Sequence, residues 1–170
     1  MTAKQETLFK WALYACATLL CVLFQGAVLQ RIRILGVFPF LYPILAATLA
    51  TLEGPVNGAI YALILGAMCD LTITTSIPCF YTLIFPPAAL CGAMMSRGLL
   101  SFGWLGSLLS SACAFLFTGA FHGLILAFSG KAAWRAAALT CWRELTVSIL
   151  FTVPVYLLFR AVYRKCLFNT

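Results

Sequence analysis

Residues 54–70 read GPVNGAIYALILGAMCD, an apolar segment in which a small residue recurs at every fourth position. The row consists of Gly54, Gly58, Ala62 and Gly66, and the next position in the same row is Asp70. Residues four apart lie on one face of an α-helix, so the segment predicts a helix with a smooth seam and a carboxyl group at its end. In lipid, small residues let two helix backbones approach closely. We therefore expect this seam to pack against another helix, in this chain or in a partner.

The whole chain is more apolar than a soluble domain. Of its 170 residues 64% are hydrophobic and 9% are charged, and the mean hydropathy is +1.04, whereas soluble domains carry about 25% charged residues. A spanning helix needs roughly 20 residues, with a range of about 17 to 25. The uncharged stretches are 11–30, 34–52, 54–69, 71–96, 98–130 and 145–159, and only 54–69 and 145–159 fall a little short of that range. The composition predicts an all-α, polytopic membrane helix bundle of about six transmembrane helices. Residues 1–170 are expected to form a single integral membrane domain.

Proline and glycine positions divide this apolar sequence into helices. We expect spanning helices at 11–30, 40–53, 55–70, 79–96, 104–128 and 145–162, with an interfacial helix at 131–144. Glu53-Gly54-Pro55 predicts a tight break between two short helices. Pro86-Pro87 predicts a kink or a break in the fourth helix.

The positive charge of the chain is typical of membrane-interface anchors. A net charge of +7 arises from 11 basic and 4 acidic residues. The basic residues lie at the ends of the apolar stretches, which is where topology signals occur, and this argues against a nucleic-acid partner. Charge is divided almost evenly between the two sides, and the tail Arg164-Lys165 favours cytoplasmic termini.

Three polar residues within the apolar stretches are candidate functional groups: Asp70, Gln25 and His122. An acid inside a membrane segment is costly without a partner, so Asp70 either binds a cation, a proton or a partner, or hydrogen-bonds nearby threonines at the membrane interface. Gln25 is placed to hydrogen-bond across helices. His122 is a lone histidine, and a histidine of this kind is more often a packed polar group than a ligand. Glu53 and Glu144 read as helix-end acids.

The sequence contains no arrangement of residues that indicates catalysis. It has no nucleophile–base pair, no phosphate-binding loop, and no cysteine or histidine spacing typical of a metal site. We therefore expect a protein that is not an enzyme and that holds no metal and no cofactor.

A set of short motifs occurs in this order along the chain: Phe24-Gln25, Gly36, Pro39, Glu53-Gly54, Gly58-Ala59, Gly66, Asp70, Pro154, Tyr156 and Arg160. In their order and spacing these motifs resemble the rod shape-determining protein MreD family of bacteria. The chain departs from that family at Phe40, where many members have an acid, and in the segment 72–78, which often contains glycine in the family.

The resemblance implies a non-enzymatic scaffold in the bacterial cytoplasmic membrane. Such a protein is expected to act with MreC, with the actin-like MreB, and with the RodA–penicillin-binding-protein synthase, in cell elongation and peptidoglycan synthesis. The family is also similar in fold to the substrate-binding subunits of energy-coupling-factor vitamin transporters. That similarity supplies the alternative, a solute-binding subunit with Asp70, Gln25 and His122 around a pocket. The small number of polar residues favours the scaffold.

Overall fold

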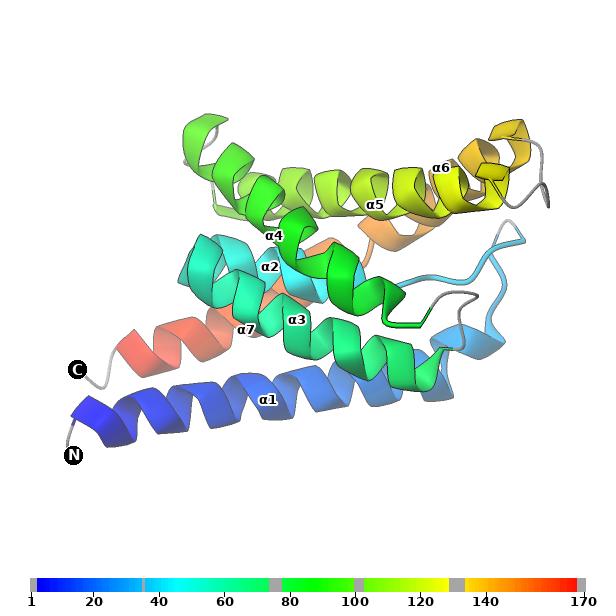
Figure 1. Cartoon of the computed structure of the whole chain (residues 1–170). Coiled ribbons are helices and arrows are strands. Elements are labelled where there is room, and N and C mark those ends of the chain that lie inside the picture. Colours follow the sequence, from blue (N-terminus) through cyan, green and yellow to red (C-terminus); the bar gives the residue numbers. More distant parts are fainter. Residues whose placement is uncertain (1–2, 35, 74–77, 100–102, 129–133, 168–170) are drawn as a thin grey trace.

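A computed structural model describes residues 3–34, 36–73, 78–99, 103–128 and 134–167 of the chain (Figure 1). Within these ranges the chain forms seven α-helices, one short 3₁₀ helix and no β-strand, so the predicted all-α class is confirmed. The elements are α1 (Ala3–Ala27), η1 (Leu29–Arg31), α2 (Tyr42–Glu53), α3 (Pro55–Thr72), α4 (Phe80–Leu99), α5 (Gly103–Phe128), α6 (Trp134–Ile149) and α7 (Thr152–Leu167).

Helix α2 forms the centre of the bundle. Every residue from Tyr42 to Ala50 is buried, as expected for a helix that is apolar all round. Its neighbours are α3, α4, α5 and α7, and in Figure 1 it lies at mid-height between α5 and α1. The core around it includes Leu45 and Leu49 of α2, Leu65 of α3 and Phe159 of α7.

A one-residue turn joins α2 to α3. Glu53 ends α2 and Pro55 begins α3, and Gly54 between them has φ +101°. Only glycine adopts this conformation without strain, and proline is pre-organised for the first helical turn. The predicted tight break is confirmed, and it places Gly54 in the turn rather than on the face of α3.

The bundle has two ends that hold different connections. In Figure 1 the chain termini and the α2–α3 turn lie at one end, which we call the termini end. The opposite end, which we call the linker end, is where α1, α3 and α5 finish and where α2, α4 and α6 begin. Successive helices therefore run in alternating directions from α1 to α5.

In the part of the chain that the structure describes, three helices are long and apolar enough to cross a membrane, within Thr7–Arg31, Pro55–Thr72 and Trp104–Ile125. A fourth crossing exists if α6 and α7, which bend by 48° at a short break, count as one broken span. Helix α2 has 12 residues, or about 18 Å at 1.5 Å per residue, against a hydrocarbon core of about 30 Å. Length and composition alone thus support three to four spans, fewer than the six that the uncharged stretches predict.

The helices differ from the sequence prediction at two places. Of the kink or break predicted at Pro86-Pro87, the break is absent: α4 continues through both prolines, because proline removes a donor yet keeps a helical φ, and neighbouring helices in a bundle can compensate. The predicted change from an interfacial to a spanning helix at 144–145 is also absent, since α6 runs to Ile149 and α7 begins at Thr152. Pro154 explains this second boundary, because the first turn of a helix does not need its missing N–H.

Candidate functional site

Asp70 lies in the last turn of α3 and binds the first turn of α4. Its Oδ1 accepts the backbone N–H of Tyr81 at 3.0 Å, and its Oδ2 accepts the backbone N–H of Thr82 at 2.9 Å and the Thr82 hydroxyl at 2.6 Å. Since α4 begins at Phe80, these backbone donors belong to its unpaired first turn. A carboxylate at this position also interacts favourably with the helix dipole. Asp70 therefore acts as an N-cap for α4 that is supplied by α3.

The sequence suggests that Asp70 bonds the threonines that directly follow it, but its threonine partner in the structure is Thr82. Thr72 bonds the Met68 and Cys69 carbonyls and the Tyr42 hydroxyl instead, and residues 74–77 lie outside the described ranges. The carboxylate is thus occupied within the chain by Thr82 and by two backbone amides.

Two glycines of the small-residue row lie against the backbone of neighbouring helices. A Cβ on Gly58 would lie 2.3 Å from the Ala50 Cα of α2, and one on Gly66 would lie 2.6 Å from the Tyr81 carbonyl oxygen of α4. Ala62, between them, is fully buried. These contacts place the row against α2 and α4 of the same chain.

Gln25 holds the segment that leads into α2. Its side chain is 2% exposed, its Nε2 donates to the Pro39 carbonyl at 2.8 Å, and its Oε1 accepts the Leu41 N–H at 3.0 Å. Leu41 is the residue before the first turn of α2. Gln25 thus bonds the backbone of a connecting segment, not the side chain of a facing helix.

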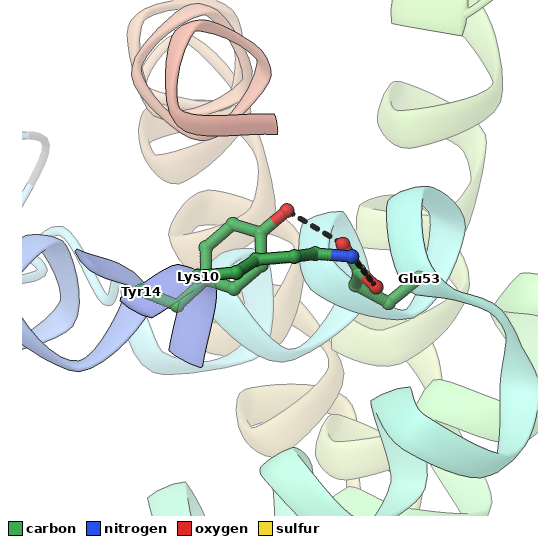
Figure 2. Close-up of polar contacts among 3 residues, drawn as sticks. All are labelled: Lys10, Tyr14 and Glu53. Atoms are coloured by element: carbon green, nitrogen blue, oxygen red, sulfur yellow. Dashed lines mark hydrogen bonds and ion pairs between the residues drawn. The ribbon is translucent and has the colours of Figure 1, made fainter. Parts of the chain in front are cut away.

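A partly buried polar cluster at the termini end joins Lys10, Tyr14 and Glu53 (Figure 2). Lys10 Nζ lies 2.6 Å from Glu53 Oε2, and the Tyr14 hydroxyl donates to Glu53 Oε1 at 2.7 Å. The Glu53 side chain is 7% exposed and that of Lys10 is 25% exposed. An acid at the C-terminus of α2 is unfavourable for the helix dipole, and the ammonium offsets this. Glu53 is a helix-end acid as the sequence predicts, but its partners are 43 and 39 positions away and were missed.

A cavity of about 440 Å³ opens near the linker end, among α1, the α1–α2 connection, α4, α5 and α6. Its wall includes the predicted residues Gln25 and His122 but not Asp70. The polar groups along it are Gln25, Gln30, Tyr81, Thr118, His122, Cys141 and Glu144. More polar groups therefore converge here than the few that the sequence indicates.

Glu144 takes part in this wall, and the interpretation of it as the first acid of the last helix is wrong. It lies well inside α6, because this helix continues past the expected boundary. Cys141, one turn earlier, packs so closely on α5 that a Cβ on Gly119 would lie 2.0 Å from its sulfur. The absence of a side chain at Gly119 therefore lets α6 bring its acid to the cavity.

No family model matches the chain, and comparison with curated proteins and with solved structures found no match. The candidate sites are three: the Asp70 cap, the Lys10–Tyr14–Glu53 cluster and the cavity. The cluster lies at the termini end, and the cap and the cavity lie towards the linker end.

Proposed function

We propose that this protein is a non-enzymatic membrane scaffold of the bacterial cell-elongation complex. It acts in the cytoplasmic membrane with MreC, and MreB and the RodA–penicillin-binding-protein synthase are further members of the complex. The resemblance to the MreD family supplies this context. The observation that carries the proposal is that the described chain is almost entirely helical, so that interactions must use helix faces and short connections.

Two helices offer apolar faces that suit a membrane partner. Helix α1 exposes Leu19, Leu20 and Leu23, and α3 exposes Ile60 and Ile64. Their glycine-rich and polar faces are already used within the bundle, by Gly58 and Gly66 of α3 and by Tyr14 and Gln25 of α1. A helix from a partner subunit would therefore meet large apolar side chains, which pack by dispersion in lipid.

The proposed layout has six crossings: α1, α2, α3, α4, α5 and the bent α6–α7 pair. The short α2 fits this layout because protein surrounds it, so it need not match the thickness of the lipid. An even number of crossings puts both termini on one side, here the cytoplasm. Reporter fusions at Thr170 and between Arg31 and Arg33 are expected to report opposite sides. The same side for both would overturn the layout.

The functional test is depletion of the protein in a rod-shaped bacterium that encodes it. We expect the cells to become round, and we expect MreC to co-purify with the full chain from mild detergent. A plasmid copy should restore the rod shape, and Asp70→Ala should restore it less well than Gly26→Ala. Gly26 is the matched control because no atom lies within 4 Å of a Cβ placed there. Normal cell shape after depletion, without MreC in the purified sample, contradicts the proposal.

The cavity favours a second candidate function. In this alternative the protein is the substrate-binding subunit of an energy-coupling-factor type vitamin transporter, with a similar fold. A volume of about 440 Å³ lies within the range of small-molecule sites, about 300–1,000 Å³. Depletion would then abolish uptake of a vitamin-like solute and leave the cell shape unchanged, which distinguishes the two functions.

A further inference from the structure

We propose that the cavity near the linker end binds a small organic cation, with Glu144 as its counter-charge. Glu144 lines the cavity, and no hydrogen bond or ion pair joins its carboxylate to another residue that the structure describes. The proposal goes beyond the scaffold function and does not depend on it, because binding is measured on the purified protein alone.

The isolation of Glu144 contrasts with the state of the two other acids whose side chains are described. Glu53 is bonded by Lys10 and Tyr14, and Asp70 is bonded by Tyr81 and Thr82. A carboxylate away from water is costly unless it is paired, and acids in membrane segments normally have a partner. Within the described chain, Glu144 lacks the partner that Glu53 and Asp70 have. A cationic ligand would supply it.

Aromatic rings form much of the wall of the cavity that Glu144 lines. Phe38, Phe40, Tyr81 and Phe115 line the cavity, and the rings of Phe40 and Tyr81 lie 5.6 Å apart at an angle of 48°. Aromatic faces attract ammonium groups, and the attraction grows when the cation is desolvated. An aromatic wall beside one carboxylate is therefore suited to a cation with an apolar body.

No basic side chain in the described lining competes with such a ligand for Glu144. No lysine or arginine belongs to the described lining of the cavity. Arg33 touches this lining from its edge, where its guanidinium lies 5.0 Å from the Phe38 ring centre. Because the Arg33 guanidinium already lies over the Phe38 ring, the rings available to a cationic ligand are those of Phe40, Tyr81 and Phe115.

The donor set argues for an organic cation rather than a metal ion. The described residues contain no group of three or more histidine, cysteine or acidic side chains that could hold a metal. A single carboxylate supplies one charge, which matches a protonated or quaternary amine. Gln30 and Thr118 are further polar groups on the wall that can orient it.

The test uses the full-length protein in nanodiscs and titrates benzyltrimethylammonium and choline by calorimetry. Choline is compared with 3,3-dimethylbutan-1-ol, its uncharged isostere. We expect saturable binding of both cations and at least tenfold weaker binding of the isostere. Equal binding of choline and its isostere, or no saturable binding of either cation, overturns the proposal.

Glu144→Gln tests the role of the acid, because it keeps the shape of the side chain and removes the charge. We expect at least a tenfold loss of affinity for the cations, and a thermal midpoint without ligand that is unchanged or higher, since an unpaired carboxylate is relieved. Arg143→Gln is the matched control, because it removes an exposed charge from the adjacent position of α6. Unchanged affinity in Glu144→Gln contradicts the proposal.

A second variant keeps the test decisive if Glu144→Gln fails to fold. Phe40→Leu retains an apolar wall and removes an aromatic face. It should weaken binding of benzyltrimethylammonium several-fold and leave the isostere unaffected. An equal loss for both probes would point to a change of cavity shape and would refute the cation site.

Discussion

Gly58→Leu is expected to prevent α3 from packing on α2 and to remove most of the folded protein. The Cβ alone would lie 2.3 Å from the Ala50 Cα and 2.4 Å from the Ala50 Cβ. Overpacking in an interior typically costs about 1–3 kcal/mol. We expect the upper end of that range or more, because the obstructing atoms include backbone of the central helix, which cannot rotate away.

The matched control is Gly26→Leu. Gly26 is also a helical glycine, but it is exposed on α1 and has no atom within 4 Å of a placed Cβ. The measurements are the yield of monodisperse protein in mild detergent and the thermal midpoint of unfolding. Gly58→Ala should lie between Gly58→Leu and the wild type. The packing argument is wrong if Gly58→Leu and Gly26→Leu unfold at the same temperature.

Local chemistry made much of the fold predictable. The hairpin of α2 and α3 follows from Gly54-Pro55, where one residue needs a positive φ and the next suits a first helical turn. The close approach of α3 to its neighbours follows from the small residues at Gly58 and Gly66. In both cases the residue type has a single strong conformational or steric consequence.

Contacts between distant segments were not predictable in the same way. Asp70 binds mainly backbone N–H groups of Tyr81 and Thr82, and backbone donors leave no trace in the residue types. The pairing of Lys10 with Glu53 joins residues 43 positions apart, and it requires knowing that α1 lies beside the end of α2. Two charges near the same membrane interface were the only available signal.

The cavity could not be predicted from the sequence for a related reason. Its wall combines residues from α1, the α1–α2 connection, α4, α5 and α6, so no single stretch carries its pattern. The prediction that Glu144 is a helix-end acid is wrong because it assumes a helix boundary at 144–145, whereas α6 continues to Ile149. Pro154 is the signal for the correct boundary, since the helix break falls just before it.

Asp70→Ala is expected to destabilise the start of α4 and to cause the second large loss of stability. The substitution removes all three hydrogen bonds to Tyr81 and Thr82. Loss of a helix N-cap costs about 0.5–2 kcal/mol, and bonds to a charged group contribute about 1.5–3 kcal/mol each. Since the freed amides can regain some bonds to water at this half-buried position, we expect a net loss of about 3 kcal/mol.

A graded series of variants separates the cap from a loss of charge alone. Asp70→Asn retains one acceptor oxygen but turns a donor towards the remaining N–H, so it should lose about half as much as Asp70→Ala. Thr82→Val removes only the hydroxyl bond and should lose least. Thr146→Val is the control, because that exposed hydroxyl bonds only a carbonyl of its own helix.

Hydrogen exchange locates the effect within the bundle. The amides of Tyr81 and Thr82 should lose protection in Asp70→Ala, whereas those of α2 should change only as far as overall stability falls. Tyr81 also lines the cavity, so loosening of this turn should weaken binding of benzyltrimethylammonium as well. If the two amides keep their protection in Asp70→Ala, the carboxylate does not cap α4. The alternative for Asp70, an acid that serves a partner or a cation, would then become the better explanation.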